Sequence, residues 1–197
     1  MTVAHRVTLK IVVFTLCSLP LAWLVFALLN DQLGANPIEV VIRRLGEWGL
    51  QLLLITLCMT PLRDLLQQGW PIQIRRMLGL FAFFYVCLHF VSYLWLDQFF
   101  DWSEIVKDII KRPFITVGML AVLGLVPLAV TSTRRAQRRL GRKWKRLHYL
   151  IYPVSILAVL HFYWLVKADL SKPAIYSLCL LALLAYRIYK QRLTLHT

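Results

Sequence analysis

The sequence MLGLFAFFYVCLHFVSYLWL at residues 77–96 decides the class of fold. It contains 20 residues and no charged side chain, and a helix of about 20 apolar residues is long enough to cross the hydrocarbon core of a bilayer. The stretch therefore predicts a membrane-spanning helix. Its one histidine, His89, would lie among apolar side chains, away from both ends of the helix.

Five other stretches have the same character, and the composition agrees with them. Hydrophobic residues make up 59% of the 197-residue chain, charged residues make up 16%, and the mean hydropathy is +0.65, which excludes an ordinary soluble domain. The sequence has no obvious internal repeat. We expect an all-α integral membrane protein, a six-helix transmembrane bundle that forms a single domain over residues 1–197. The expected spans are residues 9–29, 46–62, 77–96, 113–133, 147–166 and 173–190.

A cleaved signal peptide is the alternative interpretation of the first stretch, because Arg6 and Lys10 precede its apolar core. That core, residues 11–29, is longer than the apolar core of a signal peptide, which reaches about 15 residues. No clear small-x-small cleavage site follows it. We therefore expect a retained helix.

Charged residues in the loops predict the orientation in the membrane. If the N-terminus is cytoplasmic, 16 of the 23 basic residues and one of the nine acidic residues lie on the cytoplasmic side. Because Lys and Arg concentrate on that side, we expect both termini in the cytoplasm of an inner-membrane protein. The basic run TSTRRAQRRLGRKWKRLHY at residues 131–149 then reflects topology and contact with anionic lipid, and not nucleic-acid binding.

Residues 102–110 carry apolar side chains at helical spacing, which predicts a short helix on the outer surface of the membrane. Its role would be to cap the bundle or, alternatively, to dock a periplasmic partner. The cysteines form no CxxC or CxxCH motif, so we do not expect covalently attached c-type haem and expect the cysteines to be small packing residues. They are Cys17, Cys58, Cys87 and Cys179.

Two histidines share one predicted depth. The third and fifth spans run in the same direction, and His89 and His161 lie about 18–21 Å from the cytoplasmic ends of these spans at a rise of about 1.5 Å per residue. A histidine in hydrocarbon indicates function, although an interhelical hydrogen bond alone would also account for one. Two facing imidazoles can ligate a haem iron from both sides, which favours electron transfer. Zinc is a weaker candidate, because no third ligand lies at that depth. His5 and His196, in the tails, are expected in solvent.

His148 defines a second level near the cytoplasmic side. It lies 13 residues before His161, and Arg75 lies 14 residues before His89. A second haem could lie at this level, with His148 on one face of the haem and Arg75 or another group on the other. Arginine is an unusual iron ligand because it stays protonated, so a contact between Arg75 and a haem propionate is chemically easier. On a straight helix His148 and His161 would point about 140° apart. Pro153 lies between them and can kink or unwind the helix so that both face inward.

These residues lie in segments that resemble the MsrQ (YedZ) family, the haem-binding membrane subunits of bacterial periplasmic protein-methionine-sulfoxide reductase systems. The family belongs to a wider ferric-reductase-like transmembrane group. The resemblance is carried by TPLR at 60–63, RRMLGL at 75–80, LHFVSY at 88–93, KRPFITVG at 111–118 and TSTRRAQRRLGRKWKRLHYLIY at 131–152. The wider group pairs four histidines. His89, His148 and His161 match three of them, and Arg75 stands where the fourth would be.

The resemblance implies cofactors and partners. It implies one or two b-type haems, with His89, His161 and His148 as iron ligands, and allows FMN as a further cofactor. Electrons would come from the quinone pool, or from a cytosolic flavin reductase through FMN. They would reach a periplasmic molybdopterin-containing subunit that reduces methionine sulfoxide in oxidised proteins. This chain would then be an electron-transfer subunit, with the methionine-sulfoxide chemistry on the partner chain. The sequence has no dinucleotide-binding fingerprint, so NAD(P)H oxidation would occur on another chain.

Three other functions fit parts of the pattern. A stand-alone ferric or cupric reductase would need the same haem-binding histidines. A small transporter or proton channel would use His89 and His161 as relay groups, but it predicts acidic partners inside the spans, and the uncharged stretches contain none. A non-catalytic membrane adaptor would not need two histidines at one depth.

The charge distribution makes a topological prediction. A reporter enzyme that is active only in the periplasm, fused after residue 197, should be silent, because the bias of basic residues places the C-terminus inside. The matched control is the same reporter inserted in the loop at residues 97–101, which should be active. Activity of the C-terminal fusion would overturn the orientation.

Overall fold

The computed structural model describes residues 2–166 and 169–195, and these are almost entirely helical, with no β-strand among them. Within these ranges, six helical segments are long and apolar enough to cross a membrane. Both the all-α class and the number of spans are thereby confirmed. The location of the termini and the single domain stay predictions, and His196 lies outside the described residues.

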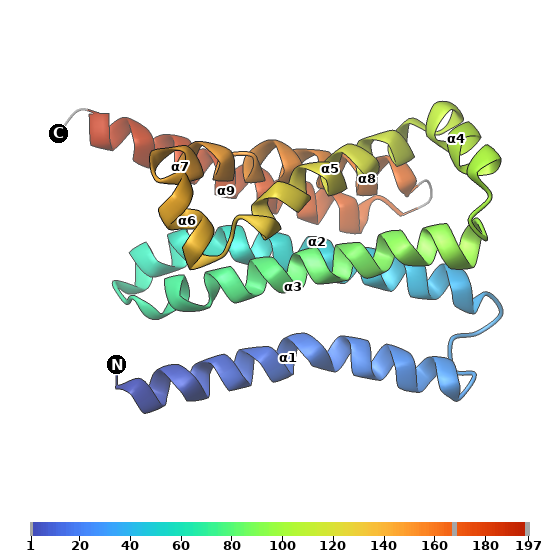
Figure 1. The fold of residues 1–197 in the computed structure, drawn as a ribbon, viewed down its shortest axis with the longest axis horizontal. Helices are drawn as coiled ribbons and strands as arrows, with labels where there is room; N and C mark the ends of the chain where they lie inside the picture. The colour runs from blue at the N-terminus through green and yellow to red at the C-terminus, as the bar shows by residue number, and fades with distance from the viewer. Residues whose placement is uncertain (1, 167–168, 196–197) are drawn as a thin grey trace. The chain divides into compact units, whose positions relative to one another are not determined.

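The chain divides into two compact units, residues 1–105 and 106–197. In the first unit, α2 and α3 form an antiparallel hairpin, and α1 packs on them (Figure 1). In the second unit, α5 and α8 form a hairpin, and α9 packs on α8. The first unit contains α1 (Val3–Leu29), α2 (Pro37–Leu66), α3 (Trp70–Ser92) and the π-helical turn η1 (Tyr93–Asp97). Helix α4 (Trp102–Lys111) begins in the first unit and continues in the second, which also contains α5 (Pro113–Val130), α6 (Arg134–Leu140), α7 (Arg142–His148), α8 (Ile151–Leu165) and α9 (Ser171–Leu195).

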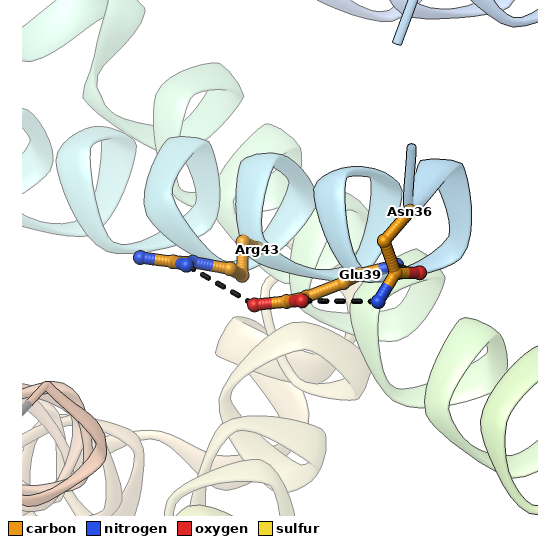
Figure 2. A network of polar contacts seen from close by, with 3 residues as sticks. All are labelled: Asn36, Glu39 and Arg43. Carbon is orange, nitrogen blue, oxygen red and sulfur yellow. Dashed lines mark hydrogen bonds and ion pairs between the residues drawn. The ribbon is translucent and has the colours of Figure 1, made fainter. Parts of the chain in front are cut away.

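Helix α2 begins nine residues before the span expected at residues 46–62, because its N-terminus is capped. The Asn36 side chain accepts a hydrogen bond from the Glu39 N–H at 3.3 Å, and its amide donates to the Glu39 carboxylate at 3.1 Å (Figure 2). Arg43 donates to the other oxygen of that carboxylate at 3.2 Å. Pro37, at the first helical position, needs no N–H partner there. These contacts stabilise a polar first turn that hydropathy alone does not reveal.

Helix α3 also begins before its expected span of residues 77–96, at Trp70, with Pro71 in its first turn. Arg75 therefore lies within a helix and is partly buried, whereas Arg76 beside it is exposed. After Ser92 the helix widens into η1, where Gln98 N–H donates to Tyr93 O at 3.0 Å. Single π-helical turns often occur beside functional residues, and His89 lies one turn before this one.

The helix predicted over residues 102–110 is confirmed as α4. The Asp101 side chain accepts hydrogen bonds from the N–H groups of Ser103 and Glu104 at 2.9 and 3.2 Å, which caps the helix start. Trp102, Val106 and Ile110 form an exposed apolar row, as a helix on a membrane surface requires.

The expected fifth span, residues 147–166, is interrupted at residues 149–150. Pro153 has no N–H to donate to Tyr149 O, four residues earlier, so the ladder fails there. The chain tightens instead: Tyr149, Leu150 and Tyr152 each donate to the carbonyl three residues earlier, at 3.0–3.2 Å. A proline-induced irregularity between His148 and His161 is thus confirmed, and it lies just before Pro153.

One buried side chain attaches α1 to α3. Pro20 interrupts the hydrogen-bond ladder of α1. The Tyr85 hydroxyl accepts a hydrogen bond from the Leu21 N–H at 3.2 Å and donates to Cys17 O at 2.7 Å, so it joins a donor and an acceptor four residues apart. Tyr85 is fully buried. Because hydrocarbon offers no water to unpaired backbone groups, this contact stabilises both helices.

Tyr85→Phe should lower the free energy of unfolding by about 1–2 kcal/mol, because it removes the hydroxyl from both backbone groups. The measurement is a denaturant titration of the purified protein in micelles, followed by circular dichroism. Tyr189→Phe, at an exposed position of α9, is the matched control and should change the value by less than about 0.5 kcal/mol. Equal midpoints for the two variants would contradict the role given to Tyr85.

Candidate functional site

His89 contacts the helix that precedes it in the hairpin. Its Nδ1 lies 2.8 Å from Ile42 O, near the start of α2, 47 residues earlier in the chain. A backbone carbonyl oxygen can only accept a hydrogen bond, so Nδ1 carries the proton. The neutral ring then has its lone pair on Nε2. The imidazole is partly buried, and its plane is set by the α2–α3 packing.

His161 makes the same contact in the other unit. Its Nδ1 lies 2.6 Å from Phe114 O, in the first turn of α5, again 47 residues earlier. By the same reasoning His161 donates from Nδ1 and has its lone pair on Nε2. The Phe114 ring lies beside the imidazole, with centroids 6.2 Å apart. Both histidines are therefore placed by a backbone carbonyl of the preceding helix in their own hairpin.

This arrangement fits the donor set of a haem iron. Histidines that ligate metals almost always donate the other ring N–H to a carboxylate, a backbone carbonyl or water, which fixes the tautomer and raises the basicity of the ligating nitrogen. His89 and His161 both have this contact. The pairing of the two across the units stays a prediction.

His148 is placed differently. Its Nε2 lies 3.1 Å from the Thr131 hydroxyl, and its ring stacks on Trp144 at a centroid distance of 4.0 Å. The Thr131 hydroxyl donates its hydrogen to Pro127 O, so it accepts from His148. Nε2 is therefore the protonated nitrogen, the reverse of the other two rings. Trp144 also donates from Nε1 to Thr131 O at 2.9 Å, so His148 and Trp144 both contact the residue that ends α5.

The structure brings some predicted site residues to one element and leaves others in separate units. His148 and His161 both contact α5, at its C-terminal end and in its first turn, so the interruption before Pro153 lets both face the same helix. Arg75 and His89 lie on α3 in the first unit. His5, expected in solvent, is exposed, and its Nδ1 lies 2.6 Å from the Thr2 hydroxyl at the start of α1.

Sequence reasoning missed the partners of the two histidines. Gly46 and Gly118 lie four residues after Ile42 and Phe114, directly under the imidazoles. The motif LHF at residues 88–90 recurs at 160–162, and each copy has a glycine 43 residues before its histidine. The two patterns are offset by 72 residues. This equal spacing was the signal in the sequence that could have indicated the glycines. The signal is weak, because few other residues are the same at positions 72 residues apart.

Comparison with known proteins identifies relatives over most of the chain. A family model described as "Ferric reductase like transmembrane component" matches residues 45–159. A "Protein-methionine-sulfoxide reductase heme-binding subunit MsrQ" from Rhodospirillum rubrum is 57% identical over 180 residues, which cover 91% of this chain and 86% of the relative. Proteins with the same description are 50% identical in Caulobacter vibrioides (92% and 87% covered) and 48% identical in Herminiimonas arsenicoxydans (92% and 84% covered). No solved structure matches the chain.

Proposed function

The chain belongs to the ferric-reductase-like transmembrane family, among the haem-binding subunits of protein-methionine-sulfoxide reductase systems, and we propose that it carries electrons across the bacterial inner membrane. The observation that carries the proposal is the repeated imidazole–carbonyl contact of His89 and His161. Two apolar helical hairpins each supply one histidine of defined tautomer. Histidines held in this way would be able to hold a haem iron.

We propose that His89 and His161, through their Nε2 atoms, would together hold one b-type haem. When bound, the haem supplies a one-electron Fe(III)/Fe(II) couple. The protein holds each ring by its Nδ1–H, so neither imidazole can rotate without breaking a hydrogen bond in a medium without water. With two protein ligands on its iron, the haem would favour electron transfer over reaction with oxygen.

The same contacts argue against a proton relay. A relay histidine must pass a proton from one nitrogen to a second titratable group. The Nδ1 of His89 and that of His161 instead face backbone carbonyl oxygens, which do not take up protons at neutral pH. The contacts therefore favour fixed ligands over the transporter alternative.

We propose that His148 and Arg75 mark the cytoplasmic level at which electrons are taken up. His148 is held by Thr131 and Trp144, within a run of basic residues on α7. Arg75 is partly buried and always charged, so it can donate paired hydrogen bonds to an oxyanion. A propionate of a second haem or a flavin phosphate of FMN offers such an acceptor, and a quinone head group offers a neutral carbonyl oxygen.

The acceptor on the other side would be the partner subunit that the description of the relatives implies. Their printed name makes them the haem-binding subunit of a protein-methionine-sulfoxide reductase. We propose that a periplasmic molybdopterin-containing subunit receives the electrons and reduces methionine sulfoxide. A stand-alone ferric reductase remains the alternative, and it predicts rapid reduction of ferric chelates in the absence of any partner subunit.

His89→Ala and His161→Ala should each abolish the same low-spin haem signal, because each removes one axial ligand of one iron. The measurement is the absorption spectrum of the purified protein, oxidised and then reduced with dithionite, with haem quantified per chain. His5→Ala, in the exposed first turn of α1, is the control and should keep the full signal. Unchanged spectra in either span variant would overturn the ligand assignment.

His148→Ala should slow haem reduction by a quinol analogue or by reduced flavin while the signal assigned to His89 and His161 persists. Arg75→Ala should do so more mildly if it only anchors an oxyanion. Arg76→Ala, at the exposed neighbouring position, is the matched control and should reduce at the wild-type rate. The assay follows the reduced haem band after mixing with each donor in turn. Wild-type rates with both donors in both variants would exclude this level as the site of electron uptake.

A further inference from the structure

Two glycines lie where a side chain would collide with the predicted haem ligands. A Cβ atom on Gly46 would lie 2.9 Å from His89 Nδ1 and 3.0 Å from its Cε1. A Cβ atom on Gly118 would lie 2.8 Å from His161 Nδ1 and 3.0 Å from its Cε1. Non-bonded heavy atoms that are not hydrogen-bonded prefer about 3.5–4.0 Å. We infer that Gly46 and Gly118 are positioning residues, each of which admits one imidazole to the helix backbone.

The position of the glycines explains how this works. In an α-helix the carbonyl of residue i points along the axis toward the N–H of residue i+4. A side chain from a neighbouring helix can reach the second lone pair of that carbonyl only by passing close to residue i+4. Gly46 is residue i+4 for Ile42, and Gly118 is residue i+4 for Phe114. Glycine leaves this approach open, because it has no Cβ.

The same device occurs twice, which separates it from general helix packing. Each copy has a carbonyl acceptor, a glycine four residues later and a histidine 43 residues after the glycine. Other helical glycines of the chain meet different groups. Gly79 faces only Thr56 Cγ2 at an ordinary 3.5 Å, Gly49 faces Val86 Cγ2 at 2.8 Å, and Gly124 faces Val154. The imidazole contacts are therefore confined to Gly46 and Gly118.

The consequence for chemistry rests on the proposed haem ligation, whereas the hydrogen bond itself does not. A donated Nδ1–H makes the imidazole a stronger electron donor at Nε2 and fixes the ring plane. Loss of the bond weakens the donor, which favours the ferrous iron and raises the midpoint potential. Each glycine would then help set the potential of the couple without touching the iron.

The test is a pair of variants, Gly46→Ala and Gly118→Ala, in the full-length protein with ¹⁵N-labelled histidine. The sample is kept reduced with dithionite, because low-spin ferrous haem is diamagnetic and the imidazole resonances are readable with or without haem. Wild-type protein should show two slowly exchanging Nδ1–H resonances, assigned by single histidine substitutions. Gly46→Ala should lose only that of His89, and Gly118→Ala only that of His161.

Matched controls isolate the effect of the imidazole from displacement of the helices. Gly79→Ala should leave both resonances unchanged, and Gly49→Ala, one turn from Gly46 and equally tight against Val86, should leave the His89 Nδ1–H bonded. In the oxidised protein, Gly46→Ala and Gly118→Ala should each change the electron paramagnetic resonance g-values and raise the midpoint potential, while Gly79→Ala should not.

Three outcomes are distinguishable. If wild-type protein binds no haem but shows both Nδ1–H resonances, the proposed function fails and the positioning role of the glycines stands. If haem is bound and both glycine variants keep both resonances, the g-values and the potential, the positioning role is overturned. If Gly49→Ala removes the His89 resonance as Gly46→Ala does, helix spacing and not access to the carbonyl is responsible, and the inference is likewise overturned.

Discussion

A neutral imidazole among hydrocarbon side chains must donate its N–H to an acceptor, and the nearest acceptors in a helical bundle are already used in helix ladders. A carbonyl oxygen has two lone pairs, so one can serve the ladder while the other serves a side chain. Ile42 and Phe114 supply such carbonyls to His89 and His161. Because each contact requires the helices of a hairpin to approach closely, it fixes the register of α2 against α3 and of α5 against α8.

Two prolines inside the predicted spans create the same need for hydrogen-bond partners, because proline lacks an N–H. Pro20 lies inside α1 and removes one hydrogen bond of its ladder, and the Tyr85 hydroxyl from α3 contacts Leu21 N–H and Cys17 O beside it. Pro153 interrupts the fifth span, and the chain tightens into bonds to the third preceding carbonyl. In both cases a contact with a neighbouring helix lies close to the proline. Tyr85 of α3 contacts α1 beside Pro20, and His148 contacts Thr131 at the end of α5.

Hydropathy predicted the six spans, and the helical spacing of apolar residues predicted α4. Both signals depend on residues that are close together in sequence. Helix ends were predicted less well. The start of α2 depends on the contacts among Asn36, Glu39 and Arg43. Because these residues are polar, hydropathy placed them in a loop before the span. The partners of His89 and His161 lie 47 residues away and are backbone atoms, which have no signature in a single sequence. Only the two LHF motifs with their glycines at equal spacing hinted at them.

The two levels of the site favour different chemistry. His89 and His161 donate from Nδ1 and offer Nε2, the nitrogen farther from the backbone and so the easier one for an iron to reach. His148 does the reverse, since its Nε2–H donates to Thr131, and binding an iron through Nε2 would first break that bond. Arg75, on α3 in the first unit, stays protonated. A fixed cation suits an anionic group better than an iron, and the Nε2 of His148 is already occupied by its hydrogen bond to Thr131.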